Sequence, residues 1–410
     1  MIATRPCLPR VDAAHRRPRR LLRALLGLLF LGLSAIAWAA PSAPRIGVAT
    51  MLPGEIFFER FGHNAIVVEY PGAEPVSYNF GIFDPGEDGF VGRFVHGDMV
   101  YRLAELPWNE DLRYYRETGR GVRIQWLDLT PAQAEAMARA LAENARPENA
   151  RYRYDYFTDN CATRVRDAID RALGGDLRRQ LTSRSRGNTY RSEAVRLARP
   201  AWWMRWGFDV GLGPAADAPL SLWEEAYVPM RLAEGLRETR LPDGRALVAS
   251  EEEVAPHRIA PEPGEQPQPW SPWLLAGLGI ALAWRLLHAR APRTALAIAG
   301  TFWFAAALLG SVMLLLWVGT EHRFTWANRN LLLFMPTAWL LLPGLWRGLR
   351  GRAPGRLFRG VLVLHAAAAG LAVFVHWLAN PPQADAHWIA LLVPIHVALW
   401  RGAGRVPTAA

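Results

Sequence analysis

The sequence predicts an α+β domain on the far side of a membrane, followed by an all-α membrane domain of five spans. Three observations carry this prediction: a basic and then apolar N-terminus, apolar segments of membrane length after about residue 270, and an uneven distribution of charge. Hydrophobic residues make up 51% of the 410 residues and charged residues only 20%, which excludes a disordered chain.

The positive charge lies outside the soluble part of the chain. The net charge is +10 and all 47 basic residues are Arg, but residues 41–270 carry 28 Arg against 34 Asp and Glu. A nucleic-acid-binding protein would carry its excess of positive charge on its folded soluble domain. The charge instead flanks apolar segments, as membrane topology requires, so no nucleic-acid partner is expected.

The first 40 residues have the organisation of a secretory signal peptide. Residues 1–23 are basic, residues 24–36 are an uninterrupted apolar run, and Ala37-Trp-Ala39 provides a cleavage site. The alternative is an uncleaved anchor helix, although this run is shorter than the roughly 20 residues that a span needs. Both interpretations export the chain from residue 41 onward, which in a bacterium means into the periplasm.

The C-terminal third of the chain is predicted to form membrane helices. Residues 261–270 form a Pro-rich linker between the domain at 41–260 and a transmembrane domain at 271–400. The predicted spans lie at about 273–288, 294–318, 331–346, 361–379 and 386–400. The three loops or tails on one side carry nine Arg and the two loops on the other side carry two. This asymmetry makes 401–410 a cytoplasmic tail and places the protein in the inner membrane, with its soluble domain in the periplasm.

Polar residues near the periplasmic ends of the spans are candidates for function. They are His322, Asn328 and Asn330 in one loop, together with His376 and His387. They either line a site that faces the soluble domain or hydrogen-bond to headgroups and loop backbone. Their spacing matches no metal motif, so no metal is expected. Residues 201–206, which contain three Trp, either enter the membrane interface or form a buried aromatic cluster.

Cys161 would be the one thiol of the exported chain, because Cys7 lies in the signal region. A lone thiol in an oxidising compartment is either a reactive group or a small buried apolar residue. Val165, Ile169 and Leu173 recur at helical spacing, and Thr158, Asp159 or Asn160 provides an N-cap. Cys161 would then lie in the first turn, where free N–H groups and the helix dipole lower the pKa of a thiol and can stabilise an oxyanion.

A cysteine nucleophile needs a base, and two histidines can supply one. His63 begins a predicted strand at 61–70, which is followed by a turn at 71–75 and a second strand at 76–83. On that second strand Asn79 or Tyr78 could orient the imidazole. His96 is the rival base, whereas His257 lies in a Pro-rich tail.

These motifs resemble those of Lnb-type bacterial lipoprotein N-acyltransferases. The resemblance covers most of residues 45–400 and rests on Gly62-His63, Tyr78-Asn79-Phe80-Gly81 and the stretch Asp159-Asn-Cys-Ala-Thr-Arg164, with residues 321–336 matching the start of the family's membrane domain. It implies a permuted papain-like fold in which the His strand precedes the Cys helix.

The resemblance also implies an activity: acyl transfer from a phospholipid, through a Cys161 thioester, to the N-terminal amine of bacterial lipoproteins, without a cofactor. Cys161 would be the nucleophile and His63 the base. Asn79 is a further catalytic candidate from its place on the neighbouring strand, and the identity of a third catalytic residue stays open. Asn160, Tyr78 and Arg164 are candidates for contacting the substrate or the oxyanion. A cell-wall cysteine peptidase or amidase, which would not need five spans, and a non-catalytic envelope scaffold are the alternatives.

Overall fold

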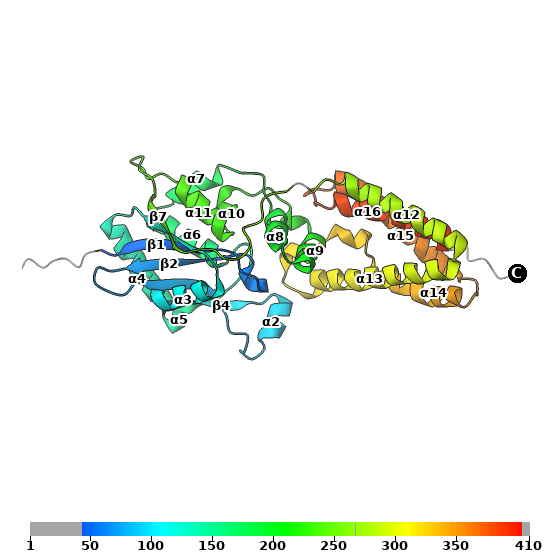
Figure 1. Cartoon of the computed structure of the whole chain (residues 1–410), viewed down its shortest axis with the longest axis horizontal. Coiled ribbons are helices and arrows are strands. Elements are labelled where there is room, and N and C mark those ends of the chain that lie inside the picture. Colours follow the sequence, from blue (N-terminus) through cyan, green and yellow to red (C-terminus); the bar gives the residue numbers. More distant parts are fainter. Residues whose placement is uncertain (1–42, 267, 404–410) are drawn as a thin grey trace, which may run out of the picture. The chain divides into compact units, whose positions relative to one another are not determined.

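The computed structural model describes residues 43–266 and 268–403. The predicted signal peptide and most of the predicted cytoplasmic tail lie outside the described residues. Within them, an N-terminal α+β domain is followed by a helical membrane region (Figure 1). Residues 261–270 between the two contain no helix or strand in their described part.

The N-terminal domain is built on one antiparallel sheet of seven strands in the order β6-β4-β3-β2-β1-β5-β7. The strands are β1 Arg45–Met51, β2 His63–Glu69, β3 Val76–Ile82, β4 Val100–Pro107, β5 Val122–Leu127, β6 Arg151–Arg153 and β7 Val248–Ala255. The two strands expected at 61–70 and 76–83 are therefore present as β2 and β3, paired with Ala65 opposite Asn79.

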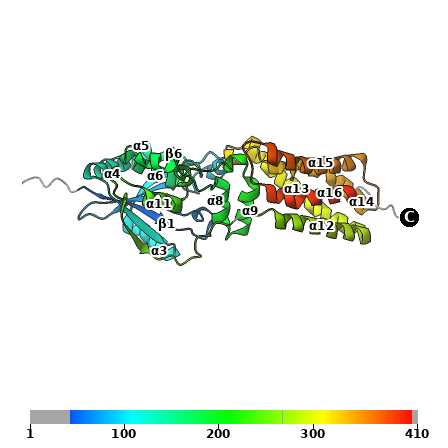
Figure 2. The same ribbon diagram turned by 90° about the horizontal axis from the view of Figure 1, so that it is seen from above.

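Helices cover both faces of this sheet (Figure 2), which explains why β1 and β2 are apolar on both sides. On one face α4 Pro131–Ala145, α6 Cys161–Ala172 and α11 Pro229–Glu238 enclose a core that includes Ile66 and Val165. On the other face α3 Trp108–Thr118 packs on Ala65, Val67 and Ile124. Successive residues on β3 therefore point in turn to the α3 side and to the α6 side, and residues two apart share a side.

Shorter helices complete the domain. They are η2 Phe57–Glu59, α2 Phe90–His96, α5 Pro147–Ala150, α7 Asp176–Thr182, α8 Tyr190–Ala198, α9 Trp202–Gly211, η3 Pro214–Ala216 and α10 Leu222–Glu225. The predicted helix after Cys161 is α6, which ends just before Gly174 and Gly175; both adopt positive φ angles of 63° and 90° that favour Gly.

Four segments of the membrane region are long and apolar enough to cross a membrane: α12 Ser271–Arg290, α13 Pro292–Gly319, the segment Arg329–Leu349 and α15 Arg356–Leu378. The third is broken into η5 Arg329–Leu332, η6 Pro336–Leu341 and α14 Leu342–Leu349, rather than the single helix expected at 331–346. Pro336 has no N–H to donate to a preceding turn, so it begins a new helical segment.

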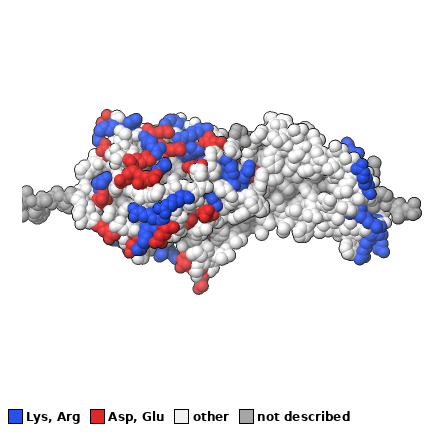
Figure 3. Space-filling model, viewed as in Figure 1, with Lys and Arg blue, Asp and Glu red and all other residues white. Residues whose placement is uncertain are grey.

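The fifth predicted span corresponds to α16 Ala386–Ala403, an 18-residue helix that packs along α12 and α15. It contains Pro394 as well as two His, and it is long enough to span but is not among the four segments that are also apolar enough. Four of the five spans are thus supported, and the fifth stays a prediction. On the face drawn in Figure 3, this helical region shows little charge except for Arg residues near one end of the region.

Candidate active site

Cys161 is the first residue of α6, at the position expected for a nucleophile. Asn160 is the N-cap: its side chain accepts a hydrogen bond from the Thr163 N–H at 3.0 Å, and the Thr163 hydroxyl accepts one from the Asn160 N–H at 2.7 Å. This reciprocal cap leaves the N–H groups of the first turn near the thiol unpaired within the helix. Cys161 is only 7% exposed.

His63 begins β2 and interacts directly with Cys161. The strand enters through Gly62, which has a φ of 76°, and a Cβ there would lie 2.9 Å from the Met51 carbonyl oxygen. Only Gly allows this turn without strain. The turn places the imidazole at the end of the sheet where α6 begins. The structure therefore brings His63, and not His96, to the thiol; His96 ends α2 and is exposed.

Asn79 orients the imidazole. His63 Nε2 lies 3.0 Å from Asn79 Oδ1, which leaves Nδ1 as the ring nitrogen available to Cys161. The amide is itself held, because its Nδ2 donates to Asp111 Oδ2 at 2.9 Å and to Ser77 Oγ at 3.1 Å. With Nδ2 donating to a carboxylate, Oδ1 must be the acceptor, so His63 Nε2 carries a proton.

Asp111 and Ser77 support this arrangement from behind. Ser77 Oγ donates to Asp111 Oδ2 at 2.7 Å, and Asp111 reaches β3 from α3. Sequence reasoning missed both residues. A signal existed for Asp111, because it lies on the same helical face as Trp108, Leu112 and Tyr115, and a carboxylate on an apolar face needs a buried partner.

The electrostatics favour a thiolate–imidazolium pair. Burial raises the pKa of Cys161, but the charge of His63, its hydrogen bond and the N–H groups of Asn64 and Ala162 outweigh burial and lower the pKa. Burial lowers the pKa of His63, but the charge and hydrogen bond of Cys161 and the hydrogen bond of Asn79 outweigh it and raise the pKa. Each group thus stabilises the charged form of the other.

Aromatic side chains pack beside the Cys161 thiol. Gly81 has a φ of 89°, and a Cβ added there would lie 3.2 Å from Tyr154 Cε2 and 3.8 Å from Cys161 Cβ. Burial, and next the charge of Cys161, raise the pKa of Tyr154 well above its usual value, so its phenol stays neutral. The ring of Tyr154 lies 4.4 Å from that of Tyr101.

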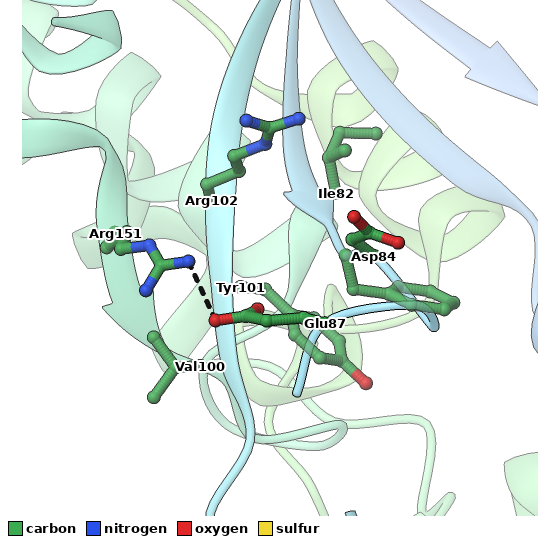
Figure 4. Close-up of a pocket in the computed structure, with 8 residues that line it drawn as sticks. Ile82, Asp84, Glu87, Val100, Tyr101, Arg102 and Arg151 are labelled. Carbon is green, nitrogen blue, oxygen red and sulfur yellow. Dashed lines mark hydrogen bonds and ion pairs between the residues drawn. The ribbon is translucent and has the colours of Figure 1, made fainter. Parts of the chain in front are cut away.

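Tyr101 also lines a cavity of about 190 Å³ at the end of β3, shown in Figure 4. An ion pair between Arg151 and Glu87 closes one side at 3.0 Å, and Arg102 and Asp84 lie on other sides. Tyr101, which lines this cavity, packs at a tilted angle against Tyr154, which lies beside the thiol.

Three predicted substrate or oxyanion candidates have other contacts. Tyr78 points to the α6 side of the sheet, where burial and next the charge of Glu105 raise its pKa to about 12. The Asn160 amide is fully used, because its Nδ2 donates to the Tyr156 and Tyr227 carbonyls. Arg164 forms an ion pair with Asp159 and covers the Tyr152 ring at 4.1 Å. The structure brings none of these side chains to the thiol.

The membrane-loop candidates connect the two parts of the chain. His322 lies 3.0 Å from the Tyr156 hydroxyl through Nδ1, and 3.2 Å from the carbonyl oxygens of Phe94 and Val95 through Nε2. The amides of Asn328 and Asn330 donate to the Val210 carbonyl at 2.8 and 3.0 Å.

The two remaining histidine candidates have carboxylate partners: His376 lies 2.7 Å from Asp385 and His387 lies 2.8 Å from Asp209. None of the five loop candidates has a contact with Cys161 or His63. Four of them hold the spans against the N-terminal domain, whereas His376 pairs with a residue of the membrane region itself.

Fold and site together define a membrane protein whose α+β domain carries a Cys–His–Asn constellation. The family model for the Lnb N-terminal periplasmic domain matches residues 43–194, which include Cys161, His63 and Asn79, and the model for the Lnb transmembrane domain matches residues 265–400. The chain belongs to the Lnb-type family. Comparisons with curated proteins and with solved structures gave no significant match.

Proposed function

We propose that this protein is a thiol-dependent acyltransferase that moves a fatty acyl group from a phospholipid to the N-terminal amine of bacterial lipoproteins. The observation that carries the proposal is the Cys161–His63–Asn79 constellation, in which the thiol is paired with an oriented imidazole. The domain that holds it is joined to membrane spans, where both substrates reside.

In the first half-reaction the Cys161 thiolate attacks the ester carbonyl of the phospholipid. A thioester forms, the ester C–O bond breaks, and the His63 imidazolium gives its proton to the departing lysophospholipid alkoxide. N–H groups of the first turn of α6 are suited to stabilise the oxyanion of the intermediate.

In the second half-reaction the lipoprotein amine attacks the thioester. His63, now neutral, accepts the proton of the amine, the amide forms and the Cys161 thiolate is released. The burial of Cys161 supports transfer over hydrolysis, because a thioester shielded from bulk water persists until the amine arrives.

The finer features of fold and topology belong to the same proposal. The His strand precedes the Cys helix, as a permuted papain-like domain requires. The Arg residues at the ends of α12, α14 and α16 and at the starts of α13 and α15 support a cytoplasmic location of those ends. The N-terminal domain would then lie in the periplasm and the spans in the inner membrane.

The test is an acyl-enzyme trapping experiment. The purified full chain is incubated with phospholipid vesicles without acceptor, and its intact mass is read before and after neutral hydroxylamine. We expect one hydroxylamine-labile acyl group on the wild type and none on Cys161→Ala. A diacylglyceryl-cysteine peptide added afterwards should take the acyl group on its amine. An unmodified wild type, or equal labelling of Cys161→Ala, would refute the proposal.

A further inference from the structure

The exposed apolar residues of the N-terminal domain are not scattered. Among residues 43–266, large exposed hydrophobic residues other than Tyr114 fall in three short segments; they are Ile56, Phe57, Phe58, Val91, Phe94, Val95, Trp202 and Trp203. Trp202 is 73% exposed and Trp203 55% exposed. Clustered exposure of this kind marks an interaction surface, whereas single exposed apolar residues need no explanation.

Ring contacts join these segments into one surface, here called the aromatic strip. Phe57 stacks on Trp203 with centroids 6.2 Å apart, which joins η2 to α9. Phe58 meets Phe83 edge to face at 5.4 Å, which joins η2 to the end of β3. Phe90 and then Phe94 extend the stack along α2, with Phe83–Phe90 at 5.5 Å.

A buried polar network around Glu59 fixes η2, so that Phe58 in the middle of the strip projects from the surface. Next to the exposed Phe58, Glu59 is only 8% exposed, pairs with Arg120 at 3.2 Å and accepts a hydrogen bond from the Tyr114 hydroxyl at 2.5 Å. A Cβ on Gly54 would lie 2.3 Å from the Glu59 carboxylate, so the loop is closely packed. The apolar tip is therefore a fixed projection that cannot fold inward to hide its rings.

Both ends of the strip are attached to the ends of membrane spans. α2 is held by Glu321 and His322, which follow α13 directly: the Glu321 N–H donates to the His96 carbonyl at 2.7 Å. On α9, Trp206 packs against Trp273 of α12 and Trp388 of α16, with centroids 5.4 and 5.6 Å apart. The strip therefore continues the zone where the spans leave the hydrocarbon. Trp is enriched in that zone, and exposed Trp and Phe side chains can insert there.

The strip also leads to the thiol. Phe83 comes two residues after Gly81, whose Cβ position lies 3.8 Å from Cys161 Cβ, and Phe58 comes five residues before His63. Phe83 stacks on Tyr101 at 4.9 Å, and Tyr101 packs at a tilted angle against Tyr154, which lies beside Cys161. Rings thus run from the membrane-proximal helices to the reactive sulfur.

We infer that the aromatic strip inserts into the leaflet next to the N-terminal domain, and that acyl chains of bilayer phospholipid lie along it while their ester reaches Cys161. The occupant is lipid, because the strip is continuous with the span ends and its exposed members are large apolar side chains. The insertion rests on the contacts above alone. The delivery of an ester to Cys161 rests on the proposed function.

Insertion is measured on the full chain in nanodiscs of phosphatidylethanolamine and phosphatidylglycerol. In a Cys7→Ser, Cys161→Ala background, single cysteines at Phe58, Val95 and Trp202 carry an environment-sensitive fluorophore, and Arg139→Cys on α4 is the control. We expect doxyl lipids to quench the three strip labels and iodide to spare them, with the reverse at the control. Equal quenching at all four positions would overturn the inference.

Delivery is measured with Phe58→Ser and Trp203→Ser in the Cys161-containing chain, with Arg139→Ser as the matched surface control. We expect acylation from vesicles to fall by at least about fivefold, as interfacial binding scales with buried apolar area. Alkylation of Cys161 by water-soluble iodoacetamide should stay unchanged, which reports an intact Cys–His pair. Normal vesicle acylation in both variants would overturn the delivery step.

The two proposals fail separately. A wild type that takes no acyl group from vesicles refutes the proposed function, while quenching still decides whether the strip inserts. Acylated wild type with unquenched strip labels refutes the inference and leaves the proposed function standing.

Discussion

Two histidines of this molecule, His63 on the sheet and His322 in the loop after α13, show how the same side chain is used in opposite ways. His322 has both ring nitrogens occupied, Nδ1 by the Tyr156 hydroxyl and Nε2 by two carbonyl oxygens. His63 has only Nε2 occupied by a structural partner, Asn79, and its other nitrogen serves Cys161. The His322 ring therefore links two parts of the chain, whereas the His63 ring is available for proton transfer.

The pKa shifts of the two rings follow from these partners. Burial lowers the pKa of His322, and the hydrogen bonds to the Val95 and Phe94 carbonyls offset it only in part, so the ring is neutral. His63 faces a group that becomes an anion, which raises its pKa despite burial. A nearby anion rather than burial therefore distinguishes the histidine that pairs with Cys161 from the histidine that joins the two parts of the chain.

The two histidines should differ most in how the rate of acyl transfer responds when each imidazole ring is removed. His63→Ala should lower the rate of acyl transfer by at least about a hundredfold, the usual range for loss of a general acid–base. His322→Ala should leave the rate within a few fold, because His322 has no contact with Cys161. Single-turnover acylation measures both; a larger loss in His322→Ala than in His63→Ala would reverse the assignment.

A second difference should appear in the pH dependence of Cys161 alkylation. Because His63 lowers the pKa of Cys161, the wild-type thiolate persists at pH values where an ordinary thiol is protonated, and reactivity falls only as pH drops through that lowered pKa. In His63→Ala burial dominates, so the midpoint should move to higher pH. Iodoacetamide rates from pH 5 to 10 measure it, with His322→Ala as control; coincident midpoints would contradict the pairing.

Two asparagines extend the comparison. Asn79→Ala frees the His63 ring and should lower the acylation rate by roughly tenfold, since a buried hydrogen bond of this kind contributes about 1 to 3 kcal/mol. Asn328→Ala removes a bond to the Val210 carbonyl and should leave the rate unchanged. Acylation assays quenched at fixed times compare the two variants. An equal loss of acylation rate in both would indicate a general loss of folding.

Asp111 acts through Asn79, so its effect should be smaller. Asp111→Asn keeps the shape but weakens the acceptor of the Asn79 and Ser77 hydrogen bonds, and we expect a few-fold loss of kcat with KM unchanged. The measurement is steady-state transfer to a lipopeptide acceptor. A change confined to KM would place Asp111 in substrate binding.

The smallest effect is expected at the contact between Tyr156 and His322. Tyr156→Phe removes only the hydroxyl beside His322 Nδ1, which should lower the free energy of unfolding by about 1 kcal/mol without changing Cys161 alkylation. Thermal unfolding in detergent measures the first and iodoacetamide the second. Altered alkylation would show that this contact acts on the active site.

Features that depend on neighbours in the chain could be predicted from the sequence. The strands β2 and β3, the helix that begins at Cys161 and most of the spans follow from local apolar patterns, turns and caps. Such patterns act over a few residues. They could not place the breaks in the segment 329–349, where Pro336 and packing against α13 act together.

The sequence alone was also enough to find Cys161 as the one thiol after the predicted signal region and to order the His strand before the Cys helix. The choice of His63 over His96 and of Asn79 over Tyr78 was decided by the tertiary structure. In the sheet Asn79 pairs with Ala65, so it shares a face with His63, whereas a slip of one residue would have presented Tyr78 instead. Asp111 comes from a helix 50 residues before Cys161, and His322 from a loop 166 residues after Tyr156. Strand register and long-range packing set these contacts. A short stretch of sequence can mark Asp111 as a carboxylate on an apolar helical face, but it cannot identify the partner.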